Sequence, residues 1–345
     1  MFNKKDIITW YMNNRLVNTL KEINATRSSL AKTSNISLSE YYEMEDAFFN
    51  LMPYSNISSE NYHITFNESG TAFIKQIFEH EIDDNTLVIS TTNEHESVKE
   101  ELDKCKHTLL LDYDNDIFNK GQHFTKLLNK ILQFKKVFVY IIGTQFSTGQ
   151  ITPQSFLINL KQKLIEYGIE HKMLLDDVHG MFIVPRDYSL FDYILYTAHA
   201  IIPKFEMGLL ISKNYDYGYK AFDWGTEYLP RLKKLLEYKE YLMYYRNMMI
   251  DYFSYLFMWP GLQLYENSVN HIFALRTTNL NFTEKMIENL DKYGIMLSGK
   301  SNEIGLMRIR FQDFVLQTPE KAIEGLELAE STLIKAIYIN KMKGE

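Results

Sequence analysis

From about residue 62 onward, short apolar runs alternate with polar stretches of helical length. The runs lie at residues 62–66, 86–90, 107–111, 137–142, 173–175, 193–196 and 208–211. This alternation is typical of βαβ units, in which helices cover both faces of a mostly parallel sheet. Ligands of such sheets bind at the carboxyl ends of the strands. The residues that follow each run are therefore the first candidates for function.

The remaining sequence predicts two flanking parts. Residues 1–58 are predicted to form an N-terminal helical segment, ahead of a large domain at 59–232. Residues 233–345 are predicted to form the small C-terminal α+β domain, entered through a long helix over 228–258. Strands are expected at 271–276 and 306–311, and helices at 283–292 and 319–338. A chain of 345 residues is long enough for two lobes.

Composition and charge exclude several classes of protein. A formal net charge of −7 argues against a protein that coats nucleic acid, which needs clustered Lys and Arg. No apolar run is long enough to span a bilayer, and the start has neither a signal core nor the composition of a transit peptide. The single cysteine, Cys105, cannot form an internal disulfide and is expected to be a buried structural thiol. We therefore expect a cytoplasmic protein without nucleic-acid or membrane partners.

The strongest local signal is LLDDVHG at residues 174–180, where an apolar strand ends in two acids. A strand-end aspartate can hold a proton on a buried pyridine nitrogen, which makes the ring a sink for electrons. Two acids beside a histidine can equally bind Mg²⁺ or Zn²⁺, or cap the end of a strand. The motif alone leaves these alternatives open.

Two further motifs also follow apolar runs. In NEHESV, residues 93–98, His95 stands where an imidazole can lie flat on a ring, although a His-Glu pair is usually a solvated surface feature. In FNESGTAF, Ser69, Gly70 and Thr71 join a strand to a helix. Such a turn offers free backbone N–H groups and the positive end of a helix dipole to a phosphate, or it is simply a helix cap.

Together and in this order, these motifs resemble those of the class V aminotransferase and cysteine desulfurase superfamily, whose members are pyridoxal-5′-phosphate (PLP) enzymes of fold-type I. The resemblance covers residues 60–315. It implies a three-layer αβα large domain with a mostly parallel sheet, a smaller C-terminal α+β domain, and PLP as cofactor. By this match Asp176 pairs with the ring nitrogen, His95 and Val178 contact the ring faces, and His179 lies near the ring hydroxyl.

The resemblance implies further binding residues. The turn at Ser69, Gly70 and Thr71 matches the one that cradles the phosphate, and Gln145 in TQFSTGQITP matches a residue that hydrogen-bonds the ring hydroxyl. Thr226, after Gly225, matches a Gly-Thr pair that reaches the phosphate of the neighbouring subunit, which implies a homodimer. Arg308, or Arg310 two residues on, matches the arginine that binds a substrate α-carboxylate.

The cofactor-binding lysine of this superfamily is missing. In FDYILYTAHAIIPKF, Thr197 and His199 match residues on the phosphate side, but the Schiff-base position is Ala200, and Lys204 is the nearest substitute. Alanine can neither form the imine nor move the Cα proton. Either the chain is a natural pseudoenzyme, or it is a Lys-to-Ala variant. The retained Asp176 favours the variant.

Several functions remain open. The leading hypothesis is a homodimeric PLP enzyme that acts on an amino acid, with aminotransferase chemistry first and lyase, decarboxylase or epimerase chemistry as alternatives. Cysteine desulfurase is disfavoured because residues 296–305, before the arginine strand, contain no cysteine. A second hypothesis is a catalytically silent PLP-fold protein that binds a partner or ligand. A third is a metal-dependent hydrolase that uses the side chains of Asp176, Asp177, His179 and His95.

Overall fold

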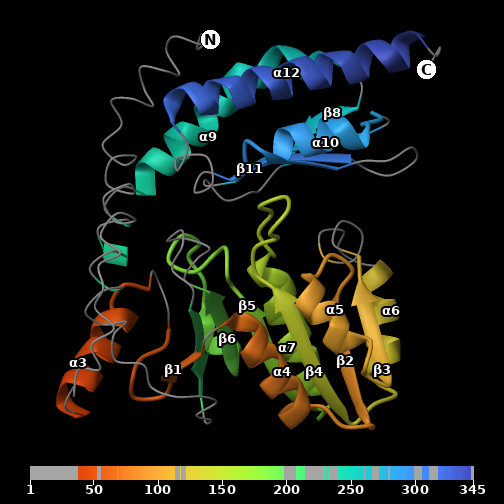
Figure 1. Cartoon of the computed structure of the whole chain (residues 1–345). Coiled ribbons are helices and arrows are strands. Elements are labelled where there is room, and N and C mark those ends of the chain that lie inside the picture. Colours follow the sequence, from red (N-terminus) through yellow and green to blue (C-terminus); the bar gives the residue numbers. More distant parts are fainter. Residues whose placement is uncertain are drawn as a thin grey trace. The chain divides into compact units, whose positions relative to one another are not determined.

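A computed structural model shows two compact units (Figure 1). It describes residues 38–52, 56–67, 69–112, 117, 122–197, 207–213, 229, 232–233, 236, 239–259, 261–265, 272–278, 280–298, 305–310 and 318–342. The described residues up to 145, together with those of 151–230, form the first unit. The second contains residues 146–150 and the described residues from 231 onward.

The first unit is built on a sheet whose described strands have the order β1-β7-β6-β5-β4-β2-β3. The strands are β1 (His63–Asn67), β2 (Thr86–Thr91), β3 (His107–Leu111), β4 (Lys136–Ile142), β5 (Glu170–Asp176), β6 (Tyr193–Thr197) and β7 (Gly208–Ser212). Strands β2 to β6 are parallel, and β7 is antiparallel to both β6 and β1. The mostly parallel sheet predicted from the alternation of apolar runs is thereby confirmed.

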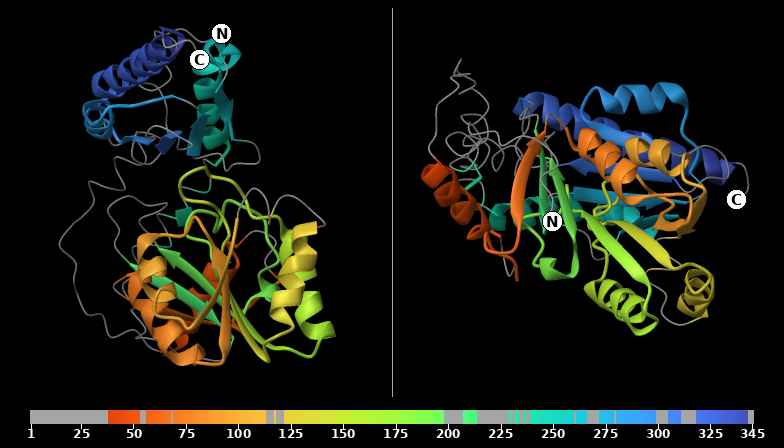
Figure 2. Two further views of the ribbon diagram at one scale, coloured as in Figure 1. Left: turned by 90° about the vertical axis from the view of Figure 1, so that its right-hand side faces the viewer. Right: turned by 90° about the horizontal axis from the view of Figure 1, so that it is seen from below.

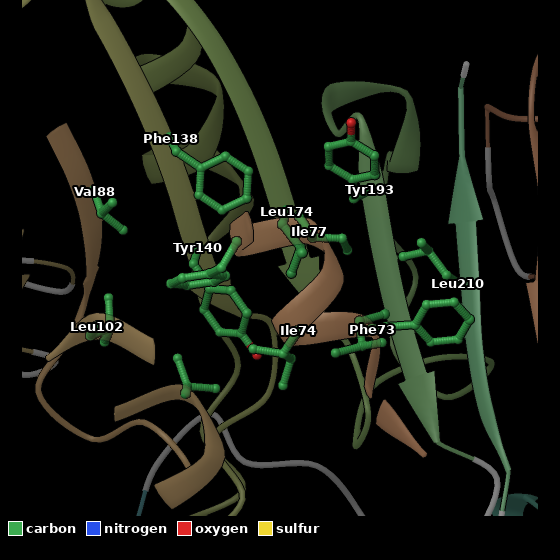
Figure 3. Packing of buried hydrophobic residues seen from close by; sticks show 13 residues of the cluster. Phe73, Ile74, Ile77, Val88, Leu102, Phe138, Tyr140, Leu174, Tyr193 and Leu210 are labelled. Carbon is green, nitrogen blue, oxygen red and sulfur yellow. The ribbon is translucent and has the colours of Figure 1, made fainter. Parts of the chain in front are cut away.

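Helices cover both faces of this sheet (Figure 2). Helices α4 (Gly70–Glu81) and α5 (Glu96–Leu102) lie on one face, and α6 (Gln122–Ile131) and α7 (Gln154–Glu166) lie on the other. Helix α3 (Leu38–Phe49) precedes β1. Figure 3 shows the core beneath α4, where Phe73, Ile74 and Ile77 pack against strand residues that include Phe138 and Tyr140. Side chains three and four residues apart share one helix face, which explains this apolar stripe.

The alternation of side chains along the strands decides which polar groups lie beneath α4 and α5. Tyr140, Leu174 and Leu195 belong to the core cluster on that face. Because side chains two residues apart in a strand share a face, Asp176 and Thr197 project from the same face as Leu174 and Leu195. The register pairs Asp176 with Leu195 across β5 and β6. The carboxyl ends of these strands therefore present their polar side chains toward the layer that contains α4 and α5.

The second unit contains an antiparallel sheet with the order β10-β11-β9-β8. The strands are β8 (Leu262–Leu264), β9 (Ile272–Thr277), β10 (Ile295–Ser298) and β11 (Gly305–Arg310). Its helices are α9 (Lys239–Phe253), α10 (Glu284–Asp291) and α12 (Pro319–Met342). The sequence correctly predicted β9, β11, α10 and α12, and it missed β8 and β10, which are too short to show an alternating pattern. None of the described helices is long and apolar enough to cross a membrane.

The long helix predicted over 228–258 does not continue as an α-helix to its expected end. It tightens after Phe253 into a 3₁₀ helix at Ser254–Met258. A tightened last turn is common where a helix ends, and Pro260 and Gly261 follow here. Most of 214–238 lies outside the described residues, so the start of this helix stays a prediction, as does the three-part domain division.

Candidate functional site

Asp176 is a buried acid at the carboxyl end of β5, with only 7% of its surface exposed. The Tyr140 hydroxyl donates to its Oδ2 at 2.7 Å, and the Val178 amide donates to its Oδ1 at 3.2 Å. Burial raises the pKa of Asp176, and the two donors act in the opposite direction because they stabilise the charged form. A neighbouring Asp177 raises this pKa further, whereas a positive charge on His95 lowers it. His95 is therefore close enough to influence the Asp176 carboxylate.

The adjacent Asp177 has a different role. Its Oδ2 accepts the Tyr188 hydroxyl at 2.6 Å, and its Oδ1 lies 3.3 Å from Nε of Arg186. Both members of this ion pair are buried. The same guanidinium donates to the carbonyl oxygens of Gly143 and Thr152, and so ties the loop after β4 to the loop after β5. Asp177 thus holds the two loops together.

The different partners of Asp176 and Asp177 weaken the interpretation of the Asp-Asp-His motif as a metal site. The Asp177 carboxylate faces a guanidinium, which already supplies its counter-charge. Within the part of the chain that the structure describes, no three His, Cys, Asp or Glu side chains are grouped so that they could hold a metal ion. The geometry therefore gives a metal-dependent hydrolase no support.

The start of α4 forms the second part of the site. Ser69 caps this helix, and its Oγ accepts the Ala72 amide at 3.2 Å. The strand register places Thr197 and Asn67 on either side of Gly208. A Cβ on Gly208 would collide with the backbone of Ser69 and Gly70, so only glycine allows the turn to pack here. The start of α4 is therefore fixed against the last residue of β6 and the first residue of β7.

Thr197 adds a hydroxyl to this helix start. Thr197 is 7% exposed, and its Oγ1 is buried without a hydrogen-bond partner among the described residues. Its methyl carbon lies 2.7 Å from the position that a Cβ on Gly70 would take, so the side chain contacts the first turn of α4. The first N–H groups of a helix have no partners within the helix. The first turn of α4, at Gly70 and Thr71, and the Thr197 hydroxyl together form a site suited to an anion.

The turn that contains His95 is also well defined. His95 caps α5, and its Nδ1 accepts the Ser97 amide at 3.3 Å while the side chain remains exposed. Gln145 is fully buried, and its Nε2 donates to the Asn93 carbonyl at 2.9 Å. Gln145 therefore fixes the turn before His95, a contact that the sequence did not predict. His179 is buried in the turn after β5.

Two residues of this edge were missed by the sequence reasoning. Tyr140 is fully buried in β4 and binds Asp176. Glu94 is 2% exposed and accepts the Thr91 hydroxyl at 2.5 Å. Burial raises the pKa of Glu94 to about 8, and the nearby Asp176 adds to this effect. Their signals were a single hydroxyl in the apolar run 137–142 and an acid directly beside His95.

The predicted substrate arginines lie in the second unit. Both are half-buried in β11, and Nη1 of Arg308 donates to the Phe146 carbonyl at 2.5 Å within that unit. His199, Ala200, Lys204 and Thr226 lie outside the described residues. The roles assigned to these residues stay predictions.

Cys105 is less buried than expected. It is partly buried in the turn before β3, where it packs against the core cluster. Its Sγ donates to the Glu101 carbonyl at 3.3 Å. Desolvation raises the pKa of the thiol to about 11, and the Glu101 charge adds to the shift. The thiol is therefore protonated at neutral pH, as a structural cysteine would be.

Comparison with known proteins gives similar solved structures. No family model and no curated protein sequence matches the chain. A NifS-like protein from Rickettsia africae superposes with a TM-score of 0.62 at 16% identity, over 92% of this chain and 96% of the other. A PLP-bound C-S lyase from Staphylococcus hominis gives 0.63 at 16% identity, over 93% and 88%.

A third similar structure is a lysine-to-alanine variant of serine palmitoyltransferase from S. paucimobilis with a bound PLP–myriocin aldimine. It gives a TM-score of 0.60 at 14% identity, over 96% of this chain and 86% of the other. At such identities a superposition establishes the fold, and it does so here over nearly the whole length of the chain. The large parallel sheet, the smaller antiparallel domain and these matches together show that the chain has the fold of the fold-type I PLP-dependent transferases.

Proposed function

We propose that this protein binds PLP at the carboxyl edge of the large sheet and acts on an amino acid. The observation that carries the proposal is the buried Asp176 carboxylate, which shares this edge with the start of α4. A buried strand-end acid suits a protonated pyridine nitrogen, and a helix start with a buried hydroxyl suits a phosphate. These are the two polar ends of PLP.

The residues present fit this cofactor. Ser69, Gly70 and Thr71 would hold the phosphate, together with the Thr197 hydroxyl, which is buried and otherwise without a partner. Asp176 would hold the ring nitrogen and keep it protonated. We assign contacts around the ring to His95, Val178, His179 and Gln145, and a further phosphate contact to His199, as the resemblance implies. Bound PLP would supply an electron sink for a substrate Cα.

The similar structures support PLP and an amino-acid substrate. The C-S lyase is described as PLP-bound, and the serine palmitoyltransferase variant holds a PLP adduct although an alanine replaces a lysine. A protein of this fold can thus retain the cofactor after a Lys-to-Ala replacement. We infer that a chain with Ala200 also binds PLP, without a covalent bond to it.

The finer assignment is an aminotransferase-type enzyme of class V, with lyase, decarboxylase or epimerase chemistry as alternatives on the same site. Arg308 or Arg310 would bind the substrate carboxylate, because guanidinium matches carboxylate with paired hydrogen bonds. We further propose a cytoplasmic homodimer in which Thr226 of one subunit reaches the phosphate of the other. Sedimentation of the PLP-loaded protein tests this, and a monomer would contradict it.

The residue at position 200 favours a second candidate. Without an amine there, the chain lacks the group that exchanges with the substrate and moves the Cα proton, which typically contributes 10² to 10⁴ in rate. The chain as given is then inactive or impaired, and a catalytically silent PLP-binding protein is the alternative function. The two differ in what happens when the lysine is restored.

A PLP titration followed by absorbance and equilibrium dialysis tests the proposal. Asp176→Asn should weaken binding by about 10- to 100-fold, because it removes a charged hydrogen bond from the ring nitrogen. Glu81→Gln is the matched control, since Glu81 is also buried and accepts the Tyr193 hydroxyl at 2.5 Å. Equal affinity in all three proteins, or no binding, would refute the proposal.

A further inference from the structure

Glu94 occupies an unusual position at the proposed site. It lies in the turn between β2 and α5, directly before His95, yet the two side chains have opposite environments. His95 is exposed, whereas Glu94 is 2% exposed. The turn is held in place because Gln145 donates to the Asn93 carbonyl and the Thr92 amide donates to the Leu111 carbonyl. The backbone therefore directs Glu94 into the interior.

The surroundings of Glu94 stabilise a neutral carboxyl better than a charged one. Thr91 donates its hydroxyl to Oε1, and Oε2 makes no hydrogen bond of ordinary length. The Ser90 hydroxyl is close enough to favour the charged form, and the nearby Asp176 opposes it. Within the part of the chain that the structure describes, no cation is among the groups that shift the pKa of Glu94. A buried carboxylate without a cation is costly, so it takes up a proton instead.

Asp176 is the better place for a negative charge. It accepts both the Tyr140 hydroxyl and the Val178 amide. Among the described residues, the neighbouring Asp177 opposes this charge, and the Arg186 guanidinium beside Asp177 supplies a counter-charge. Burial raises the pKa of Tyr140, and the Asp176 charge adds to this effect, so Tyr140 remains a donor.

We propose that Glu94 and Asp176 form an acid pair that carries one proton at neutral pH, held on Glu94, so that the site presents a single negative charge. Two carboxyl groups close together in a buried site cannot both ionise easily. Glu94 is then a positioning residue, which acts on the ligand through Asp176. The assignment of this charge to a ring nitrogen rests on the proposed function, whereas the proton on Glu94 does not.

The acid pair explains why the site would prefer a ligand with a single positive charge. One carboxylate beside a neutral acid matches a ligand with one positive ring nitrogen. The charges of the Asp176 carboxylate and of the ring nitrogen then compensate each other. An additional charge on Glu94 would leave an uncompensated anion in a buried place. Glu94→Gln imitates the protonated form, because an amide oxygen can still accept the Thr91 hydroxyl.

The test is the stability of the ligand-free protein as a function of pH. The unfolded chain ionises Glu94 near its ordinary pKa of 4.5, and the folded chain does so only near 8. Between these values the folded state binds more protons, so the contribution of Glu94 to stability falls as the pH rises. Denaturant unfolding of the unmodified chain, Glu94→Gln and Glu81→Gln is measured at closely spaced pH values across this range.

The expected result is that Glu94→Gln gains stability relative to the unmodified chain as the pH rises from about 4.5 to about 8. Glu81→Gln is measured beside it as the control for removing a buried carboxyl group, because Glu81 is also buried and accepts the Tyr193 hydroxyl. If the difference in stability between Glu94→Gln and the unmodified chain stays constant or falls as the pH rises, the acid pair is refuted. The PLP titration at neutral pH separates the two proposals. If the stability difference between Glu94→Gln and the unmodified chain rises with pH but PLP does not bind, only the proposed cofactor is refuted. If PLP binds but this difference does not rise, only the acid pair is refuted.

Discussion

The two edges of the large sheet differ in how their polar side chains are bonded. At the amino edge each acid meets a donor: Glu81 accepts the Tyr193 hydroxyl, and Asp83 lies 3.1 Å from the Lys136 ammonium. Hydrogen bonds from the Asn85 amide and from Lys136 lower the pKa of Asp83. This hydrogen bond and this ion pair help to hold the fold.

At the carboxyl edge some buried polar groups are incompletely bonded by the described residues. Burial raises the pKa of Asp176 and brings that of Glu94 to about 8, and the Thr197 hydroxyl has no partner. Buried polar groups without full hydrogen bonding reduce stability. Folded proteins tolerate this cost mainly where a ligand completes the bonding. The contrast between the edges therefore supports a ligand site at the carboxyl edge.

The largest expected effect concerns an amine at the carboxyl edge. Ala200→Lys should give PLP a visible absorption band that borohydride bleaches, and peptide mapping should find the reduced adduct at residue 200. Lys161 serves as the control, because this half-buried amine donates to the Leu190 carbonyl near the amino edge, and burial lowers its pKa. An adduct on Lys161 would contradict the assignment of position 200. So would an adduct that is lost when Lys204 is replaced by alanine.

Next in size is the loss of the buried ion pair between Asp177 and Arg186. Asp177→Asn leaves the Arg186 guanidinium buried without its counter-charge and should lower the free energy of unfolding by about 3 to 5 kcal/mol. Lys136→Met breaks an ion pair that is much more exposed and should change stability little. Denaturant unfolding measures both. Equal losses would remove the distinction between a structural pair at the site and a surface pair at the opposite edge.

The pH dependence of stability should have opposite signs at the two edges. The folded-state pKa of Asp83 is lowered, so its contribution is present above its ordinary pKa of 3.8 and is lost as the pH falls below it. Asp83→Asn should therefore reduce stability at neutral pH and have less effect in strong acid. Glu94→Gln should instead have its largest effect at alkaline pH. Matching pH profiles for the two variants would contradict the comparison.

The smallest effect separates helix capping from phosphate binding at the start of α4. Ser69→Ala removes the cap and should cost about 1 kcal/mol of stability. Ser69→Asp keeps a capping oxygen but adds a negative charge where we place the phosphate. It should preserve stability and weaken PLP binding, as measured by thermal unfolding and by the PLP titration. Unchanged PLP affinity in Ser69→Asp would show that the phosphate does not bind at this helix start.

Much of the fold could be predicted because the apolar runs are long enough to show their pattern. Each predicted strand of the large sheet is present, although β5 begins earlier, at Glu170, since its first residues are polar and partly exposed. The strand-end positions of Asp176 and Thr197 followed directly from the same pattern. Short elements such as β8 gave no periodic signal.

The interior of the site was less predictable, because it depends on register between distant strands. The residue types of LLDDVHG leave open which acid faces a ligand, and the family resemblance alone favours Asp176. In the structure Asp176 accepts the Tyr140 hydroxyl, and Asp177 faces Arg186. Tyr140 reaches Asp176 because β4 and β5 pair in parallel with Ile142 opposite Asp176. Contacts between residues far apart in the chain decide which acid faces the ligand site and which one holds the fold.

A structure of the protein with PLP tests the central claim most directly. We predict density for the cofactor at the carboxyl edge, with its ring nitrogen about 2.7 to 3.2 Å from a carboxylate oxygen of Asp176, its phosphate at the start of α4, and a ring face against His95. Density for a metal ion between Asp176 and His179, or PLP bound with its ring nitrogen away from Asp176, would contradict the account.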